Sequence, residues 1–411
     1  SEEYVNFDVD AQLWHSLPCY NELFSEPDFV LNRYEPYLYY PRLMEAWHEG
    51  LIGKAKAIYD LPGLILPHGY LPPIKPNPWY MENQQFDYCL DTAGQVLKLV
   101  WNFWDYVADD AMLRDLIYPV TRDLAIFYEA FARKHFDGRY YNLMPVVEPE
   151  NWGISFQLSH TKNTTAAIAM FRKILHCAIE GATLLGVDAD RIPGWREVAD
   201  NLPPYPTCRV SSGEIFSGLP DVAPRWMDGD HPWFSGDYPA TLADEITLDS
   251  PQEEKDMIAR TNDVVRTERN SLGYILVGKF KDHVPSTLHS SARPIDSGEV
   301  LMQEVTKHSE RLLNSRSGRM HLFPLVPDWA EIAFRDFLAR GGFSVSAARD
   351  KDGVKAVLIK AKRSIPCRVM NPWAGTRVIP GTIRVTEAAD GGTVPFELEE
   401  EYREELTTII P

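Results

Sequence analysis

The sequence has few cysteines and places none of them in a recognisable pattern. Its five cysteines are scattered along 411 residues, without CxxC or Cys/His zinc spacing. This distribution supports neither a disulfide framework nor a structural metal site. No window contains the roughly 20 consecutive apolar residues that a membrane span requires, and no sequence unit of about 20–50 residues repeats, which disfavours a solenoid. We therefore expect no metal, no cofactor and no membrane span.

The chain also lacks an excess of positive charge. Its 41 Lys and Arg residues stand against 59 Asp and Glu, which gives a net charge of −18. Binding to a nucleic-acid backbone needs Lys/Arg patches, so this charge argues against a nucleic-acid partner. It does not exclude a polyanionic sugar in a local basic pocket. The 11 Trp residues and 12% aromatic content are high, and flat aromatic faces stack on sugar rings as well as fill cores.

An initial methionine and a signal peptide are also missing. The chain opens directly on Ser1. We expect that a leader or an upstream domain has been removed and that the protein is secreted or periplasmic.

Apolar residues at helical spacing predict paired helices along most of the chain. The clearest cover residues 85–107, 110–135 and 161–186. Asp109 or Asp110 is expected to cap the second helix, and Pro119 to kink it. Gly186 is expected to end the third. Weaker helical patterns cover residues 193–201, 251–269 and 297–313.

The apolar period changes to two near the end of the chain. Short alternating runs separated by Asp/Gly turns fill residues 343–399, which predicts an antiparallel β module. We therefore divide the chain into a helical domain at residues 1–340 and a sandwich-like β module at residues 341–411. Helical hairpins closed into a ring would present their connecting loops at one end, where a pocket forms.

The stretch PVVEPENWG is the strongest candidate for chemistry. It holds Glu148 and Glu150 on either side of Pro149, and Trp152 follows. Because Pro149 restricts its own backbone and that of the residue before it, the loop should be stiff. A carboxyl group held in a partly dry place has a raised pKa and suits general-acid catalysis. The alternative is a solvated acidic loop that caps the next helix.

Two irregular, proline-rich segments and the amino terminus supply further candidates. Residues 61–84 carry His68, Tyr70, Lys75 and Trp79, and residues 221–245 carry Arg225, Trp226 and His231. Long ordered loops in compact domains are often functional. Acidic neighbours, including Asp237, would favour the protonated form of His231 if they lie close to it. The amino terminus carries Asp8, Asp10 and Trp14, although on the residues alone a capped helix start is the better explanation of the two aspartates.

Several of these motifs stand in an order that resembles a known enzyme family. They are DVDAQLWHSLP at Asp8–Pro18, EPEN at Glu148–Asn151, DHPWFSGDYPA around His231, RPIDSGEV around Asp296, and GRMHLFPLVPDW followed by FLARGGFSVS. Together they resemble glycoside hydrolase family 95, the inverting α-L-fucosidases and α-galactosidases with an (α/α)6 catalytic barrel. The last pair is the most specific and marks the fold more than the chemistry.

The resemblance implies roles for individual residues. Glu150 matches the general acid and Asp296 the catalytic aspartate. Asp8 and Asp10 match two asparagines that position the attacking water, so this chain departs from the family there. Three carboxylates around one water would repel, and at least one should hold a proton or meet a cation. The segment after Asp296 also differs from the family pattern.

The resulting hypothesis is exo-acting, inverting hydrolysis of a terminal α-linked sugar, L-fucose-like or galactose-like, from an oligo- or polysaccharide. The resemblance and the aromatic content give Trp14, Trp79, Trp152 and Trp226 as sugar platforms, with His68, His231 and Glu148 as further substrate contacts. A polysaccharide lyase acting on a uronate is the first alternative, since His68, Tyr70, Lys75, Arg225 and His231 offer cations and bases. A non-catalytic glycan-binding protein is the second. The acidic character of the matched positions favours hydrolysis.

Overall fold

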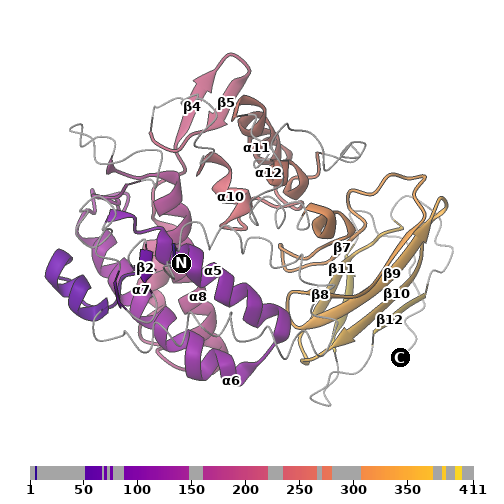
Figure 1. The fold of residues 1–411 in the computed structure, drawn as a ribbon, viewed down its shortest axis with the longest axis horizontal. Helices are drawn as coiled ribbons and strands as arrows, with labels where there is room; N and C mark the ends of the chain where they lie inside the picture. Colours follow the sequence, from indigo (N-terminus) through magenta and orange to yellow (C-terminus); the bar gives the residue numbers. More distant parts are fainter. Residues whose placement is uncertain are drawn as a thin grey trace.

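The structure is a computed structural model that separates into a helix-rich part and a β-rich part (Figure 1). It describes residues 5–6, 51–66, 69–71, 75–76, 88–147, 161–220, 235–265, 271–279, 307–373, 382–385 and 394–399. Within these ranges the long helices precede the larger sheets, as the sequence predicts, and the short strands β1 to β5 lie among the helices.

The first predicted helix pair is confirmed. Helix α5 (Thr92–Val107) is followed by a continuous helical stretch made of α6 (Asp110–Met112), the π-helix η3 (Leu113–Ile117) and α7 (Tyr118–Arg133). Asp109 caps this stretch, because its side chain accepts hydrogen bonds from the backbone N–H groups of Ala111 and Met112, both at 3.0 Å. Pro119 lies in the first turn of α7, directly after the π-helix, so the helix is irregular at the predicted kink.

The third predicted helix, α8 (Thr165–Leu185), is confirmed as well and packs closely on α5. Gly186 ends it in the left-handed conformation, with φ 68°. A Cβ atom on Gly94 of α5 would stand only 2.4 Å from the Cβ of Met170 on α8, so the two helices touch because residue 94 has no side chain. Helices α5, α7 and α8, together with α9 (Ile192–Asp200), enclose the largest hydrophobic core.

Shorter elements complete the helix-rich part. One group lies between α9 and the β-rich part: β4 (Thr207–Val210), β5 (Gly213–Phe216), the 3-10 helix η5 (Ser235–Asp237), α10 (Tyr238–Thr241), α11 (Gln252–Val265) and α12 (Ser271–Leu276). A second group comes from the first part of the chain: β1 (Val5–Asn6), β2 (Gly69–Leu71), β3 (Lys75–Pro76) and a helix at residues 51–59.

The β-rich part begins with a helix at residues 307–312 and a small hairpin, and then forms two further sheets. The hairpin is β6 (Leu313–Asn314) with β7 (His321–Leu322). A four-stranded sheet has the order β12-β10-β9-β8, and a two-stranded sheet pairs β11 with β13. Their bounds are β8 (Ile332–Ala339), β9 (Phe343–Asp350), β10 (Gly353–Ala361), β11 (Cys367–Met370), β12 (Thr382–Val385) and β13 (Phe396–Glu399).

The pairing of these strands corrects part of the prediction. Strands β8, β9 and β10 are antiparallel as expected, but β12 pairs with β10 in parallel, and β13 pairs with β11 in parallel. After β10 the chain crosses to the other sheet as β11 and returns as β12, and such a crossover permits parallel pairing. Alternating hydrophobicity predicts that a strand has one buried face, but it does not predict whether the strand pairs with its neighbour in parallel or antiparallel.

Side chains from both of these sheets fill one second core. It contains Val345 from β9, Ile359 from β10 and Val369 from β11, all fully buried. Two sheets that share a core in this way are typical of a sandwich. Strand β8 starts at Ile332, so the sheet begins before the run at residues 343–399 that the alternation predicted. The division at residue 340 stays a prediction.

The segment ARGGF joins the two parts. The backbone N–H of Gly341 donates to the Asp105 carboxylate, and that of Gly342 donates to the Asp105 carbonyl oxygen, both at 2.8 Å. Both glycines have positive φ, 87° and 75°, which a residue without Cβ adopts at low cost. A Cβ on Gly342 would also lie 2.4 Å from the Cβ of Ala108, at the end of α5. The motif that marks the fold therefore makes the contact between the β-rich part and α5.

We expect Gly342→Ala to destabilise the protein more than Gly318→Ala does. Gly318 shares the positive φ, at 79°, but a Cβ there would meet nothing within 4 Å. The two variants therefore differ in the overpacking against Ala108. We expect this overpacking to lower the free energy of unfolding of Gly342→Ala by about 1–3 kcal/mol more than that of Gly318→Ala. Urea unfolding of both variants measures it, and equal losses would show that the close approach has no energetic consequence.

Candidate functional site

Tyr70 and Lys75, which were named for the lyase alternative, lie in β2 and β3. Every residue that the hydrolase hypothesis assigns to the site lies outside the described residues. These are Asp8, Asp10, Trp14, His68, Trp79, Glu148, Glu150, Trp152, Trp226, His231 and Asp296. Their roles therefore stay predictions. The described residues do show the contacts of residues that flank several of them in sequence.

The segment at 148–160, which carries Glu148, Glu150 and Trp152, starts and ends at one place. The backbone N–H of Val146 donates to the carbonyl of Thr161 at 2.9 Å, and that of Val147 donates to the carbonyl of Tyr88 at 3.0 Å. Tyr88 is the first described residue after the segment at 77–87. The ends of these two segments are therefore hydrogen-bonded to each other.

The end of the 221–234 segment belongs to the same region. Helix α8 starts four residues after Thr161, with Thr164 as its cap. The Thr165 backbone N–H donates to the carbonyl of Gly218 at 3.0 Å, and its hydroxyl donates to the carbonyl of Ser217 at 2.5 Å. Helix α8 also contacts η5, where the chain re-enters the described structure at Ser235. Residues that flank the segments at 148–160 and 221–234 thus lie near the amino-terminal end of α8. These segments carry predicted sugar-binding and catalytic residues.

Two buried acids lie near this end of the molecule. Asp91 precedes α5 and accepts a hydrogen bond from the Gln95 side chain at 2.8 Å. Asp237 precedes α10, and burial raises its pKa to about 7, against a weaker lowering by the Thr241 hydroxyl. The sequence grouped Asp237 with the acids that would favour a protonated His231. Because Asp237 is largely uncharged below about pH 7, it is a weak source of that effect.

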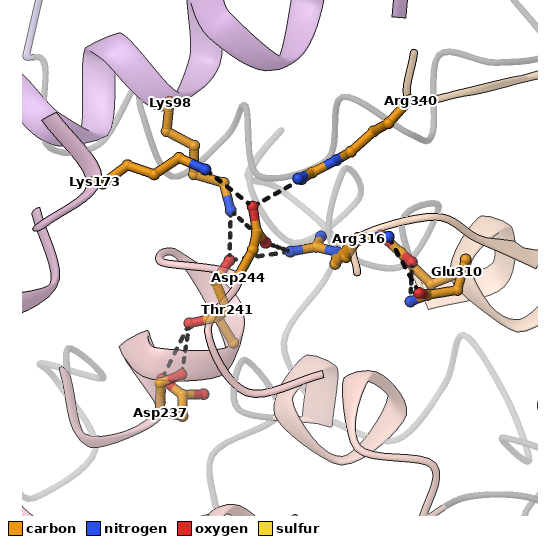
Figure 2. Close-up of polar contacts among 9 residues, drawn as sticks. Lys98, Lys173, Asp237, Thr241, Asp244, Glu310, Arg316 and Arg340 are labelled. Carbon is orange, nitrogen blue, oxygen red and sulfur yellow. Dashed lines mark hydrogen bonds and ion pairs between the residues drawn. The ribbon is translucent and has the colours of Figure 1, made fainter. Parts of the chain in front are cut away.

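A group of charged side chains surrounds Asp244 (Figure 2). One carboxylate oxygen is 2.7 Å from Arg316 and 3.2 Å from Lys98, and the other is 2.7 Å from Arg340 and 3.4 Å from Lys173. Arg316 also bonds the buried Glu310 at 2.7 Å. We call Lys98, Lys173, Asp244, Glu310, Arg316 and Arg340 the Asp244 cluster.

Burial controls the charge states in the Asp244 cluster. Burial alone would raise the pKa of Asp244, but the charges of Arg340, Lys98 and Arg316 outweigh it and hold that pKa well below its usual value. Burial also lowers the pKa of Lys98 well below its ordinary value, although Asp244 opposes this shift. The side chains of Lys98, Asp244 and Arg316 are at most 4% exposed. With so little surface, the cluster is suited to a structural role rather than to binding a substrate.

The Asp244 cluster connects elements that are distant in sequence. Lys98 comes from α5, Lys173 from α8 and Asp244 from the turn after α10, whereas Arg316 and Arg340 come from the β-rich part. Sequence reasoning did not find it. The FLARGGFSVS segment could have indicated this cluster in the sequence. It contains Arg340, and its two glycines donate hydrogen bonds to Asp105.

The amino-acid sequence matches a family model. Residues 34–215 match the glycosyl hydrolase family 95 catalytic domain. Over these residues the chain is similar to family 95. The match is less than half of the 411 residues. It includes Glu150 but ends before His231 and Asp296, and it begins after Asp8 and Asp10.

The other comparisons with known proteins are more remote. A solved structure of a protein assigned as a kojibiose phosphorylase from the human microbiome matches it with a TM-score of 0.41 and 11% sequence identity. That alignment covers 78% of this chain and 50% of the other, so this chain spans half the length of that protein. No curated protein sequence matches significantly. None of these findings favours the lyase alternative.

The described ranges contain neither a helix able to span a membrane nor a cluster of metal-binding side chains. None of their helices combines the length and apolar character that crossing a membrane requires. No group of three or more His, Cys, Asp or Glu side chains there is arranged to hold a metal ion.

We expect Asp244→Asn to lower the free energy of unfolding by about 3–5 kcal/mol, because it leaves buried cations without a counter-charge. Asp60→Asn is the matched control. Asp60 pairs with Lys56 on the surface, where both side chains are more than 60% exposed, and its loss should not change stability measurably. Urea unfolding at pH 7 checks both, and a cluster variant as stable as the control would contradict the structural role.

Proposed function

We propose that the protein is an exo-acting glycoside hydrolase that removes a terminal α-linked sugar, L-fucose-like or galactose-like, with inversion. The family 95 match over the segment that carries Glu150 supports this proposal most directly. It places the chain among carbohydrate-active enzymes, and the substrate and stereochemistry follow from the motifs quoted above.

In the proposed mechanism a general acid and an attacking water act on opposite faces of the sugar ring. Glu150 protonates the leaving oxygen, and a water held by Asp296 with Asp10 or Asp8 attacks from the opposite face. An inverting pair of carboxyl groups stands roughly 6.5–9.5 Å apart, which leaves room for that water. The hydrogen bonds at Val146, Val147 and Thr165 support the proposal, because they gather segment ends near the start of α8.

The proposed architecture is an (α/α)6 ring in the helix-rich part, followed by a β module that includes β8 and so begins before the predicted division at residue 340. The close α5–α8 contact at Gly94 and the common core of α5, α7, α8 and α9 support paired helices. In such a ring the connecting segments meet at one end. The ends gathered near Thr165 fit that expectation.

We expect Glu150→Gln to lower kcat about 100- to 10,000-fold, because a positioned general acid contributes that much to bond cleavage. Glu148→Gln is the matched comparison, since it removes a carboxylate from the same loop; as a predicted substrate contact it should raise KM and leave most of kcat intact. Release of a chromogen from aryl α-L-fucosides and α-galactosides measures both. Near wild-type turnover in Glu150→Gln would remove Glu150 from the mechanism.

The same assay addresses the non-catalytic alternative, which the Asp residues at positions 8 and 10 keep open. Binding of these glycosides by the wild-type protein without any release of chromogen would favour a glycan-binding protein over a hydrolase.

A further inference from the structure

The sheet β12-β10-β9-β8 is hollowed on the face that points away from its core. Residues paired across neighbouring strands lie on the same face of a sheet. The register therefore places Ala333, Ala348 and Ala356 in one row on the outer face, and Ser346 and Leu358 in the next row. These residues line an open hollow of about 650 Å³. We call this hollow the trough.

Small side chains on the middle strand explain the trough. On the outer face β9 carries Ser344, Ser346 and Ala348. The ion pair between Lys360 of β10 and Asp336 of β8, at 2.7 Å, crosses β9 at the row of Ser344 and bounds the trough at that end. The Ser346 Oγ accepts a hydrogen bond from the Asp336 backbone N–H at 2.8 Å. Its hydroxyl hydrogen is left to donate to a ligand.

Two large side chains at the trough have no partner among the described residues. Trp329 lies four residues before Ala333 of the trough and is 72% exposed. No aromatic ring in the described ranges contacts its indole, and no group there accepts its N–H. Arg335, which lines the trough, is also exposed and forms no ion pair or hydrogen bond within those ranges. A flat apolar face and a cation are therefore both open to a ligand.

The turn that carries Trp329 is fixed to the sheet. The Arg349 guanidinium of β9 donates to the carbonyl oxygens of Val326 at 3.3 Å and Asp328 at 3.1 Å. The Ala330 backbone N–H closes the turn by donating to the carbonyl of Pro327 at 3.0 Å. A platform that is already held in place loses little freedom when a ligand binds to it.

The chemistry of this face fits a carbohydrate better than a protein partner. A sugar ring offers a C–H face that stacks on an indole and hydroxyl groups that bond a guanidinium and a serine. The core of a protein interface is depleted of charged residues. This face carries Arg335, Lys360 and Asp336, and the floor of the trough is made of alanine and serine. A second copy of the chain would have to bury these charges.

We propose that the outer face of β8, β9 and β10 is a second carbohydrate-binding surface. A polysaccharide stacks on Trp329 and continues over the trough, where Arg335 and Ser346 bind its hydroxyl groups. This surface holds the polymer and takes no part in bond cleavage, so it raises affinity for long glycans only. Its benefit to hydrolysis rests on the function proposed above, whereas binding itself does not.

The binding test uses Glu150→Gln as the parent, so that the polymer is not cleaved. Calorimetry measures its affinity for fucosylated xyloglucan and for galactomannan, which end in α-L-fucose and α-galactose. Adding Trp329→Ala should weaken binding of at least one polymer about tenfold, because an aromatic anchor dominates such a surface. Adding Arg335→Ala should weaken it about threefold, through lost hydrogen bonds. Leu184→Ala, which truncates a side chain of α8 that is 52% exposed, is the control and should keep the parent's affinity.

Kinetics with Glu150 intact separate this surface from the hydrolytic site. Trp329→Ala should keep the wild-type kcat and KM on aryl α-L-fucosides and α-galactosides, which are too short to reach both sites. If the wild type shows no turnover, the hydrolase proposal fails, and the calorimetric comparison still decides the surface. Equal affinities of the parent and its Trp329→Ala variant, or no binding of either polymer by the parent, would overturn the proposal. Analytical ultracentrifugation tests the other occupant, since a dimer that Trp329→Ala converts into a monomer would make this face an interface between copies and would also overturn it.

Discussion

A carboxylate surrounded by four cationic side chains is the constraint on which the described arrangement of this protein depends. Asp244 brings one negative charge into a place where Lys98, Lys173, Arg316 and Arg340 converge. Desolvation of this many charges is costly, and hydrogen-bonded pairing offsets part of that cost. The required partners come from α5, α8 and the β-rich part, so any other placement of these elements would leave buried charges unpaired. We infer that the main role of the Asp244 cluster is to specify how α5, α8 and the β-rich part pack, and that its net contribution to the free energy of unfolding is secondary.

That arrangement has consequences for the proposed site. The cluster ties α5 and α8 to each other through Lys98 and Lys173, and Gly94 lets the same helices touch near their amino-terminal ends. The segment ends at Tyr88, Val147, Thr161 and Gly218 are hydrogen-bonded to one another or to the start of α8. The fixed packing of α5 on α8 therefore has two consequences. It places Lys98 and Lys173 where they contact the β-rich part through the Asp244 cluster, and it brings the ends of several connecting segments together.

Helix positions could be predicted from the sequence because each rests on local information. The 3.6-residue spacing of apolar side chains gave α5, α7 and α8, and Asp109 and Gly186 mark ends whose backbone groups need those residue types. Strand direction was missed at β12 and β13 because alternation reports a buried face only. The Asp244 cluster was missed because Lys98 and Lys173 read as ordinary polar positions, and their partner lies more than 70 residues away. Of the predicted catalytic residues, Glu150 lies within the family match, and the roles of Glu150, Asp296, Asp10 and Asp8 stay predictions.

The central claim is that acids far apart in the chain meet around one sugar at the end of the molecule where these segments gather. A crystal structure of the Glu150→Gln variant with an unhydrolysed α-L-fucoside or α-galactoside tests it most directly. The claim predicts that the side chains at positions 150 and 296 lie on opposite sides of the anomeric carbon, roughly 6.5–9.5 Å apart. Side chains that face different surfaces, or that lie in separate packing layers, would contradict it.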